Sequence, residues 1–165
     1  MPAEPALLSE ALAEFILGPV AIALASRSAG NAPSLARGGG CRVAPDRRRI
    51  TVFLARGGAE QLLADVAAHD LVAVTFGLPG PEEAVQIKGD QVRLAPLEAA
   101  DRAALEPYRR AWAERLTSLG YPTEFARAKV SWPEDDMLAL SFTPRQVFNQ
   151  TPGPRAGDAL AGAGR

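Results

Sequence analysis

Three consecutive glycines, Gly38-Gly39-Gly40, lie inside a segment whose flanks predict a β-strand. Glycine in a strand interior costs backbone entropy and packs poorly, so a run of three needs a compensating reason. One possible reason is chemical: without side chains, the backbone can approach a flat ligand or a phosphate. The other is structural, a bulge, a barrel corner or a loop before Cys41. On the glycines alone we favour the structural interpretation.

Gln86 and Lys88 are two residues apart in another predicted strand, so they share one face, and Val85 and Ile87 share the other. A polar pair of this kind can hold a planar heterocycle or a phosphate. A solvated sheet face is common and is the default interpretation of the spacing. Both interpretations stay open at this point.

The remaining polar residues favour structural roles. The basic run 46–49 has no aromatic neighbours and is typical of a solvated turn. His69 ends a predicted helix, where the helix dipole favours a cation. Cys41 has no histidine near it in the sequence and is expected to be a small buried side chain. With one cysteine and one histidine, a single chain has no disulfide and no Cys/His zinc site, so we expect no metal.

Composition predicts one soluble globular domain. The chain has 165 residues, 47% of them apolar and 22% charged, with a formal net charge of −1. This balance predicts no nucleic-acid partner. The N-terminus lacks a positive signal-peptide region, and the longest apolar stretch is too short to span a bilayer, so we expect a cytoplasmic protein without a membrane partner. We expect a domain over 1–150 and a flexible C-terminal tail over 151–165.

Hydrophobic periodicity predicts the elements that must position these residues. Helices are predicted over 5–17, 59–68 and 97–119, the last in two pieces with Pro107 opening the second. Strands are predicted over 20–26, 34–43, 49–55, 71–76, 84–88, 91–94, 125–132 and 137–142, and Thr143-Pro144 is predicted to start one helical turn. Strands in consecutive runs argue for an antiparallel sheet or barrel with helices at its ends.

Segment 21–96 resembles the pyridoxamine 5′-phosphate oxidase-like family of FMN-binding split barrels. The resemblance is carried by the order and spacing of SLARGGGCRV, ITVFLAR, LVAVTFGLP and VQIKGDQVRL, and by the C-terminal TPRQVFNQTPGP. It implies a mainly β, α+β fold, a six-stranded antiparallel split β-barrel with peripheral helices. It also implies a homodimer with FMN at the interface.

The resemblance further implies that the glycine strand passes along the flavin and that residues 55–58 lie near the ribityl phosphate. Lys88 or Arg37 is expected near the N1–C2=O edge of the flavin, where a cation stabilises the reduced ring. No catalytic residue can be assigned. The cofactor-binding candidates are Arg37, Gly38, Gly39, Gly40, Arg56, Gln86, Lys88 and Gln150.

We therefore expect an FMN-dependent oxidoreductase with a small-molecule substrate. The sequence has Arg56-Gly57-Gly58 where the oxidase pattern has Ser-Arg-Lys, and it lacks the oxidase's C-terminal arginine and histidine, so oxidation of pyridoxamine phosphate is not expected. FAD, a deazaflavin and haem remain alternative cofactors, since relatives use them. The alternative functions are a non-catalytic module that stores or senses a flavin, and a dimeric scaffold whose site has decayed.

Overall fold

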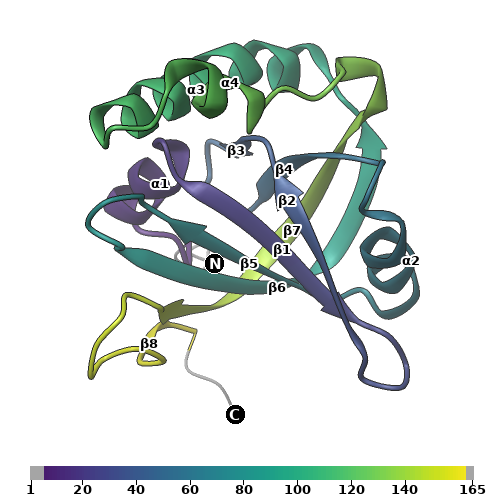
Figure 1. Ribbon diagram of the computed structural model, residues 1–165. Helices are drawn as coiled ribbons and strands as arrows, with labels where there is room; N and C mark the ends of the chain where they lie inside the picture. The colour runs from purple at the N-terminus through teal and green to yellow at the C-terminus, as the bar shows by residue number, and fades with distance from the viewer. Residues whose placement is uncertain (1–5, 163–165) are drawn as a thin grey trace.

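The computed structural model describes residues 6–162 and contains a β-barrel with helices around it (Figure 1). The helices are α1 (Glu10–Leu17), α2 (Glu60–His69), α3 (Ala99–Ser118) and α4 (Thr123–Ala128), with the short 3-10 helix η1 (Glu134–Asp136). The strands are β1 (Ala21–Arg27), β2 (Pro33–Gly38), β3 (Cys41–Val43), β4 (Ile50–Ala55), β5 (Val72–Gly77), β6 (Ala84–Pro96), β7 (Met137–Asn149) and β8 (Ala159–Ala161).

All strand pairs are antiparallel, and the order is β2-β1-β5-β6-β7-β4-β3, with β8 added to β7. The predicted α+β split barrel is thus confirmed, with eight strands among residues 6–162 in place of six. The difference has a simple origin. β2 and β3 are two parts of one predicted strand, interrupted at Gly39 and Gly40, and β8 is a short addition.

The interrupted strand closes the barrel. β2 pairs with β1, and β3 pairs with β4. At the interruption the Gly39 N–H donates to the Phe53 carbonyl (2.7 Å), and the Phe53 N–H donates to the Gly40 carbonyl (2.9 Å). The backbone groups between the two halves are therefore satisfied by β4, and no open edge remains at this point.

The core fills the barrel and the space beneath α3. Alternate residues of the strands point inward and are fully buried, including Leu24, Val74, Phe76 and Ile87. Tyr108 and Trp112 of α3 pack over the barrel, stacked with 6.4 Å between ring centroids, and the Tyr108 hydroxyl donates to the Val20 carbonyl (2.8 Å). Leu105 and Leu116 of the same helix are also buried, so this side of α3 belongs to the core.

Helix α2 covers another part of the barrel and is tied to β2 by a buried polar contact (Figure 1). The Ser34 hydroxyl donates to the Asp65 carboxylate (2.6 Å), and Gln61 donates to the other oxygen of the same carboxylate (3.0 Å). His69 lies in the last turn of α2, as predicted.

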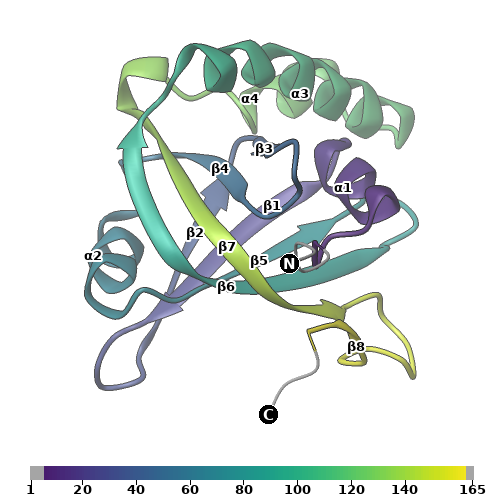
Figure 2. The same cartoon turned by 180° about the vertical axis from the view of Figure 1, so that it is seen from behind.

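Three predictions for the second half of the chain are wrong: the strand over 125–132, the division of the helix over 97–119 at Pro107, and the helical turn at Thr143. Residues 125–132 were expected as a strand, but Phe125 lies in α4, because the buried residues there, Ala126 and Val130, are four apart, the spacing of a helix. Helix α3 is continuous through Pro107, held by its buried stripe. Thr143 and Pro144 lie inside β7, the long strand seen in Figure 2, and start no helical turn.

Pro144 is tolerated in β7 because the β6–β7 pairing is irregular there. Gly89 pairs with Pro144, and register shifts flank it, so one long strand with bulges replaces the two strands predicted around Gly89-Asp90. A Cβ on Gly89 would lie 3.0 Å from the Thr143 carbonyl carbon, which explains the glycine.

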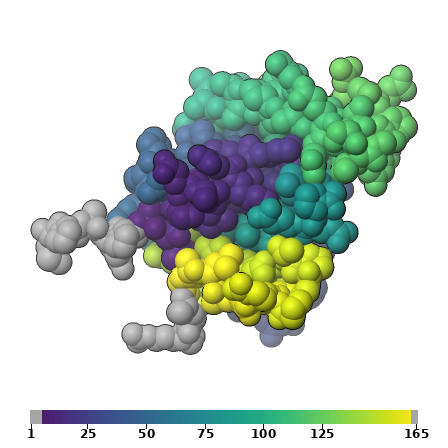
Figure 3. All heavy atoms as spheres, turned by 90° about the vertical axis from the view of Figure 1, so that its left-hand side faces the viewer, coloured from purple at the N-terminus to yellow at the C-terminus, as the bar shows by residue number. Residues whose placement is uncertain are grey.

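The segment after Asn149 folds back along the barrel. It makes turns, and β8 then pairs with β7. Figure 3 shows this yellow segment lying against the rest of the molecule. Residues 163–165 of the predicted tail lie outside the described residues.

Candidate functional site on the outer barrel face

Five strands place one row of side chains across the outside of the barrel. Arg37 pairs with Ala23, Ala23 with Thr75, Thr75 with Gln86, and Gln86 with Phe148. In β1, β5 and β6 the neighbours of these residues along the strand are buried, so the row itself faces outward. The register therefore brings Arg37 and Gln86, both candidates from the sequence, onto a common surface with Phe148.

A second row runs beside the first. It consists of Leu35, Ala25, Ala73, Lys88 and Gln146, again one residue from each of β2, β1, β5, β6 and β7. Ala25 and Ala73 in this row are small, and Leu35 beside them is 69% exposed. We call the surface formed by the two rows together the outer face. Its middle is therefore nearly flat. β1, which carries Ala23 and Ala25, crosses the front of the barrel in Figure 1.

Lys88 is the cation nearest the middle of the outer face. Its Nζ lies 4.9 Å from the centroid of the Phe148 ring, so the two residues form a cation–π contact. Among residues 6–162 no carboxylate forms an ion pair with Lys88. Its charge is thus available to an anion.

A hollow of about 530 Å³ adjoins the second row at the Lys88 end. Arg27 and Arg145 contribute two further cations to its lining. Arg145 is paired with Asp90 (2.7 Å), whereas Arg27 donates to the neutral Asn31 side chain (2.8 Å). Three cations and one carboxylate give the hollow a positive balance.

Gln150 lies at the margin of the same surface. Its N–H donates to the Ala84 carbonyl (2.8 Å), and Ala84 pairs with Gly77 of β5. Gln150 continues the two-residue alternation that places Gln146 and Phe148 on the outside of the barrel. Four predicted residues, Arg37, Gln86, Lys88 and Gln150, thus occur on one side of the barrel.

The glycine run has a packing explanation. A Cβ on Gly38 would lie 2.7 Å from Ile22 and 2.8 Å from Val52, and a Cβ on Gly39 would lie 2.7 Å from the Trp132 ring. Gly40 has a φ of +126°, which disfavours other residues, and a Cβ there would meet Phe53 and Tyr108. The chain's own side chains fill the space, so the glycines need no ligand to explain them, in agreement with the structural interpretation favoured above.

The turn after β4 also differs from what the resemblance implies. Its backbone N–H groups already have acceptors: Gly57 donates to the Asp136 carboxylate (3.1 Å) and Gly58 to that of Glu60 (3.2 Å). Carboxylates thus lie where a phosphate would need free donors. Arg56 is exposed beside them. The local electrostatics disfavour a phosphate site at this turn.

The sequence interpretation missed Arg27, Arg145 and Phe148. Arg145 and Phe148 were missed because Thr143-Pro144 was interpreted as the start of a helical turn, which removed the two-residue alternation of β7 from view. Arg27 ends β1 on the side of the outer face, two residues after Ala25.

The donor set of the outer face fits a flavin. The alanines and Gly77 leave a flat surface for a planar ring, Gln86 and Lys88 offer hydrogen-bond donors to polar ring edges, and the hollow offers cations to a phosphate.

Buried titratable groups elsewhere are structural. Burial raises the pKa of the Cys41 thiol to about 12, and its Sγ donates to the Ile16 carbonyl (3.2 Å). Burial likewise raises the pKa of Tyr108. Neither group ionises near neutral pH, so neither is a nucleophile. Residues 6–162 contain no cluster of three metal-ligating side chains. Over the same residues no helix is long and apolar enough to cross a membrane.

Comparison with solved structures places the fold in a known class. The chain superposes on HupZ of Group A Streptococcus (TM-score 0.54, 12% identity, covering 91% of this chain and 99% of that chain). It also superposes on a Lactobacillus delbrueckii protein described as a candidate pyridoxamine 5′-phosphate oxidase (0.53, 11%, 86% and 93%). A third match is an F420 reductase (0.52, 10%, 85% and 98%).

The fold implied by the resemblance, that of pyridoxamine 5′-phosphate oxidase-like split barrels, is thereby confirmed. No family model matches the sequence, and no curated protein sequence matches it significantly. Identities of 10–12% show a shared fold.

Proposed function

We propose that the outer face binds a flavin, FMN in the first instance, and that the protein is a homodimeric oxidoreductase acting on a small molecule. The observation that carries this proposal is the row Arg37–Ala23–Thr75–Gln86–Phe148 with Lys88 beside it. It combines a flat apolar surface with donors at the edge and cations in an adjoining hollow. Metal chemistry has no comparable support, since residues 6–162 contain no cluster of three metal-ligating side chains.

The names of proteins with the same fold support a redox role. One is an F420 reductase, and another is described as a candidate pyridoxamine 5′-phosphate oxidase. These names favour a flavin or a deazaflavin as the cofactor. A deazaflavin is therefore the second candidate, ahead of FAD and haem.

Each residue of the site has a defined task in this proposal. Gln86 and Lys88 orient the ring by hydrogen bonds at its polar edge, and the Lys88 charge favours an electron-rich ring. Arg27 and Arg145 hold the phosphate, and Arg37 binds at the far end of the row. The bound flavin would supply the electron-transfer chemistry that the side chains lack.

The exposure of the same surface supports the proposed homodimer. A ring lying on Ala23 and Ala73 would keep one side in water unless another body covered it. Leu35, 69% exposed on the outer face, is an apolar contact for such a body. A second copy of the chain would bury both the leucine and the ring.

The first test is the visible absorption spectrum of the purified protein before and after addition of FMN, with any extracted chromophore identified. We expect a flavin spectrum shifted by binding. Lys88→Ala should weaken FMN binding about tenfold, since a charge-assisted contact to the ligand is lost.

Arg56→Ala distinguishes the outer face from the turn after β4. We expect FMN affinity to stay within about twofold, because carboxylates occupy that turn. A colourless protein that binds neither FMN nor a deazaflavin would contradict the proposal. Loss of FMN binding in Arg56→Ala with normal binding in Lys88→Ala would place the phosphate at the turn instead.

A non-catalytic flavin-binding module is the second candidate, because the same surface would serve storage or sensing. Turnover decides between the two. Reduction of the bound flavin by a nicotinamide donor, followed by reoxidation with an added acceptor over many cycles, supports the enzyme. A bound flavin that completes no cycle with any donor supports the module.

A further inference from the structure

We propose that a second site, in the cleft between α3 and α4, binds a small organic anion through Arg127 and Arg109. The cleft has a volume of about 750 Å³ and is larger than the hollow beside the outer face. None of its lining residues belongs to the outer face or to its hollow. The proposal is therefore independent of the flavin site.

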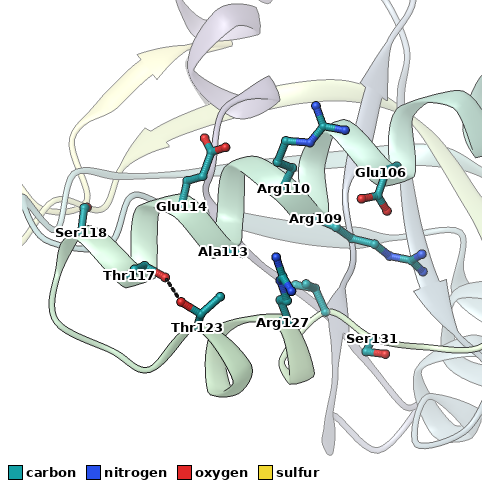
Figure 4. Close-up of a pocket in the computed structure, with 11 residues that line it drawn as sticks. Glu106, Arg109, Arg110, Ala113, Glu114, Thr117, Ser118, Thr123, Arg127 and Ser131 are labelled. Carbon is teal, nitrogen blue, oxygen red and sulfur yellow. Dashed lines mark hydrogen bonds between the residues drawn. The ribbon is translucent and has the colours of Figure 1, made fainter.

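The cleft is built by a helical hairpin above the barrel. Helix α3 and the segment from α4 to Ser131 form its two walls (Figure 4). At one end the hydroxyls of Thr117 and Thr123 are hydrogen-bonded to each other (3.4 Å). Ala113 and Val130 supply apolar lining between the walls.

Two arginines from different walls line this space. In Figure 4 Arg127 points from α4 towards α3, and Arg109 extends along the cleft from α3. The Arg109 guanidinium is fixed by the Trp132 carbonyl (3.1 Å) and lies 3.7 Å from Glu134. Arg127 is exposed and forms no ion pair within residues 6–162. One cation is thus preorganised, and the other is free to close on a ligand.

The two carboxylates that line the cleft, Glu106 and Glu114, leave the space beside Arg127 open to an anion. Glu114 points away from α4 in Figure 4, as does Arg110. Glu106 lies on the α3 wall close to Arg109. The space between Arg127, Thr123 and Ser131 is consequently cationic and rich in hydroxyl donors.

The lining specifies the class of ligand. A guanidinium matches the oxygens of a carboxylate or a phosphate in a two-pronged arrangement, and hydroxyls complete the shell. A cleft of this volume lies in the range of sites for organic molecules, and it exceeds the needs of a bare ion. The ligand would place its anionic group at Arg127 and its carbon skeleton against Ala113 and Val130.

The test is a titration of the full-length protein, at constant ionic strength, with two probes: phenyl phosphate and benzoate. Binding is measured by calorimetry and by NMR. We expect saturable binding of at least one probe, with amide shifts of Thr117, Thr123 and Ser131. The probe that binds more tightly identifies the anionic group as phosphate or carboxylate.

Arg127→Gln should weaken the binding about tenfold, because one charged donor is lost. Arg155→Gln is the matched control, since its side chain is 77% exposed on the C-terminal segment and it removes the same charge. Lys88→Gln should leave the affinity of the cleft unchanged, which separates this site from the flavin site.

The proposal would be overturned if neither probe showed saturable binding up to about 10 mM. Equal affinities in Arg127→Gln and Arg155→Gln, or shifts confined to amides of the outer face, would also overturn it. Because Arg127 is exposed, its variant is expected to keep the thermal midpoint of the unliganded protein.

Discussion

The two faces of the β1–β5–β6 sheet have opposite characters. On the inner face the side chains are large and fully buried, as Leu24, Phe76 and Ile87 show. On the outer face the same strands carry alanine, threonine, glutamine and lysine. The inner face accounts for folding, since it removes large apolar surfaces from water. The small residues of the outer face are not needed for that, and they leave room for a ring and a second chain.

The largest effect on stability should come from a substitution on the inner face of β5, compared with one at the adjacent residue on the outer face. Phe76→Ala removes a fully buried ring and should lower the free energy of unfolding by about 3–5 kcal/mol. Thr75→Ala, one residue earlier on the outer face, should change it by no more than about 0.5 kcal/mol. Urea denaturation of both variants measures this difference. Similar losses of unfolding free energy in the two variants would show that the outer face contributes to stability as much as the core does.

A bulky charge on the outer face should separate the two chains without unfolding either. Ala25→Arg places a cation between Leu35 and Ala73 in the second row, so we expect a monomer with the circular dichroism of the parent. Sedimentation velocity measures the change. Ala103→Arg, on the exposed side of α3, is the control and should keep the dimer. A parent that is monomeric, or an Ala25→Arg dimer, would contradict the proposed interface.

The buried hydrogen bond between β2 and α2 should have a medium effect when it is lost. Ser34→Ala deletes the hydrogen bond to Asp65 and leaves that buried carboxylate with Gln61 alone. We expect a loss of about 1–3 kcal/mol in the free energy of unfolding. Ser118→Ala, an exposed serine, provides the comparison by thermal denaturation and should cost less than about 0.5 kcal/mol.

The smallest effect concerns pH. Burial raises the pKa of Cys41 from 9.0 to about 12, so the folded state keeps a proton that the unfolded state releases. The free energy of unfolding should therefore fall as pH rises above about 9. Cys41→Ala should reduce this slope, with Tyr108 accounting for part of the remainder, since burial also raises its pKa. Urea denaturation between pH 9 and 11 measures the slope of the unfolding free energy against pH. A slope that is unchanged in Cys41→Ala would argue against the buried thiol as its source.

Prediction from sequence worked where the pattern was local. β1, β4, β5 and α2 were predicted to within a residue or two, because their alternation or helical spacing is regular and turn residues bound them. It failed for residues 125–132 and for Thr143-Pro144. In the first case two buried residues four apart define a helix, and in the second a bulge admits proline into a strand.

The sequence by itself determined which side of each strand is large and which is small, and it placed Gln86 and Lys88 together. Only the tertiary structure decided that Arg37 and Phe148, 111 positions apart in the numbering, share a row with Gln86. Register depends on long-range pairing and on bulges such as the one at Gly89, which no local pattern encodes. One of the two carboxylates at the Arg56 turn, that of Asp136, likewise comes from a residue distant in sequence, and it accepts from the Gly57 N–H that a phosphate would need.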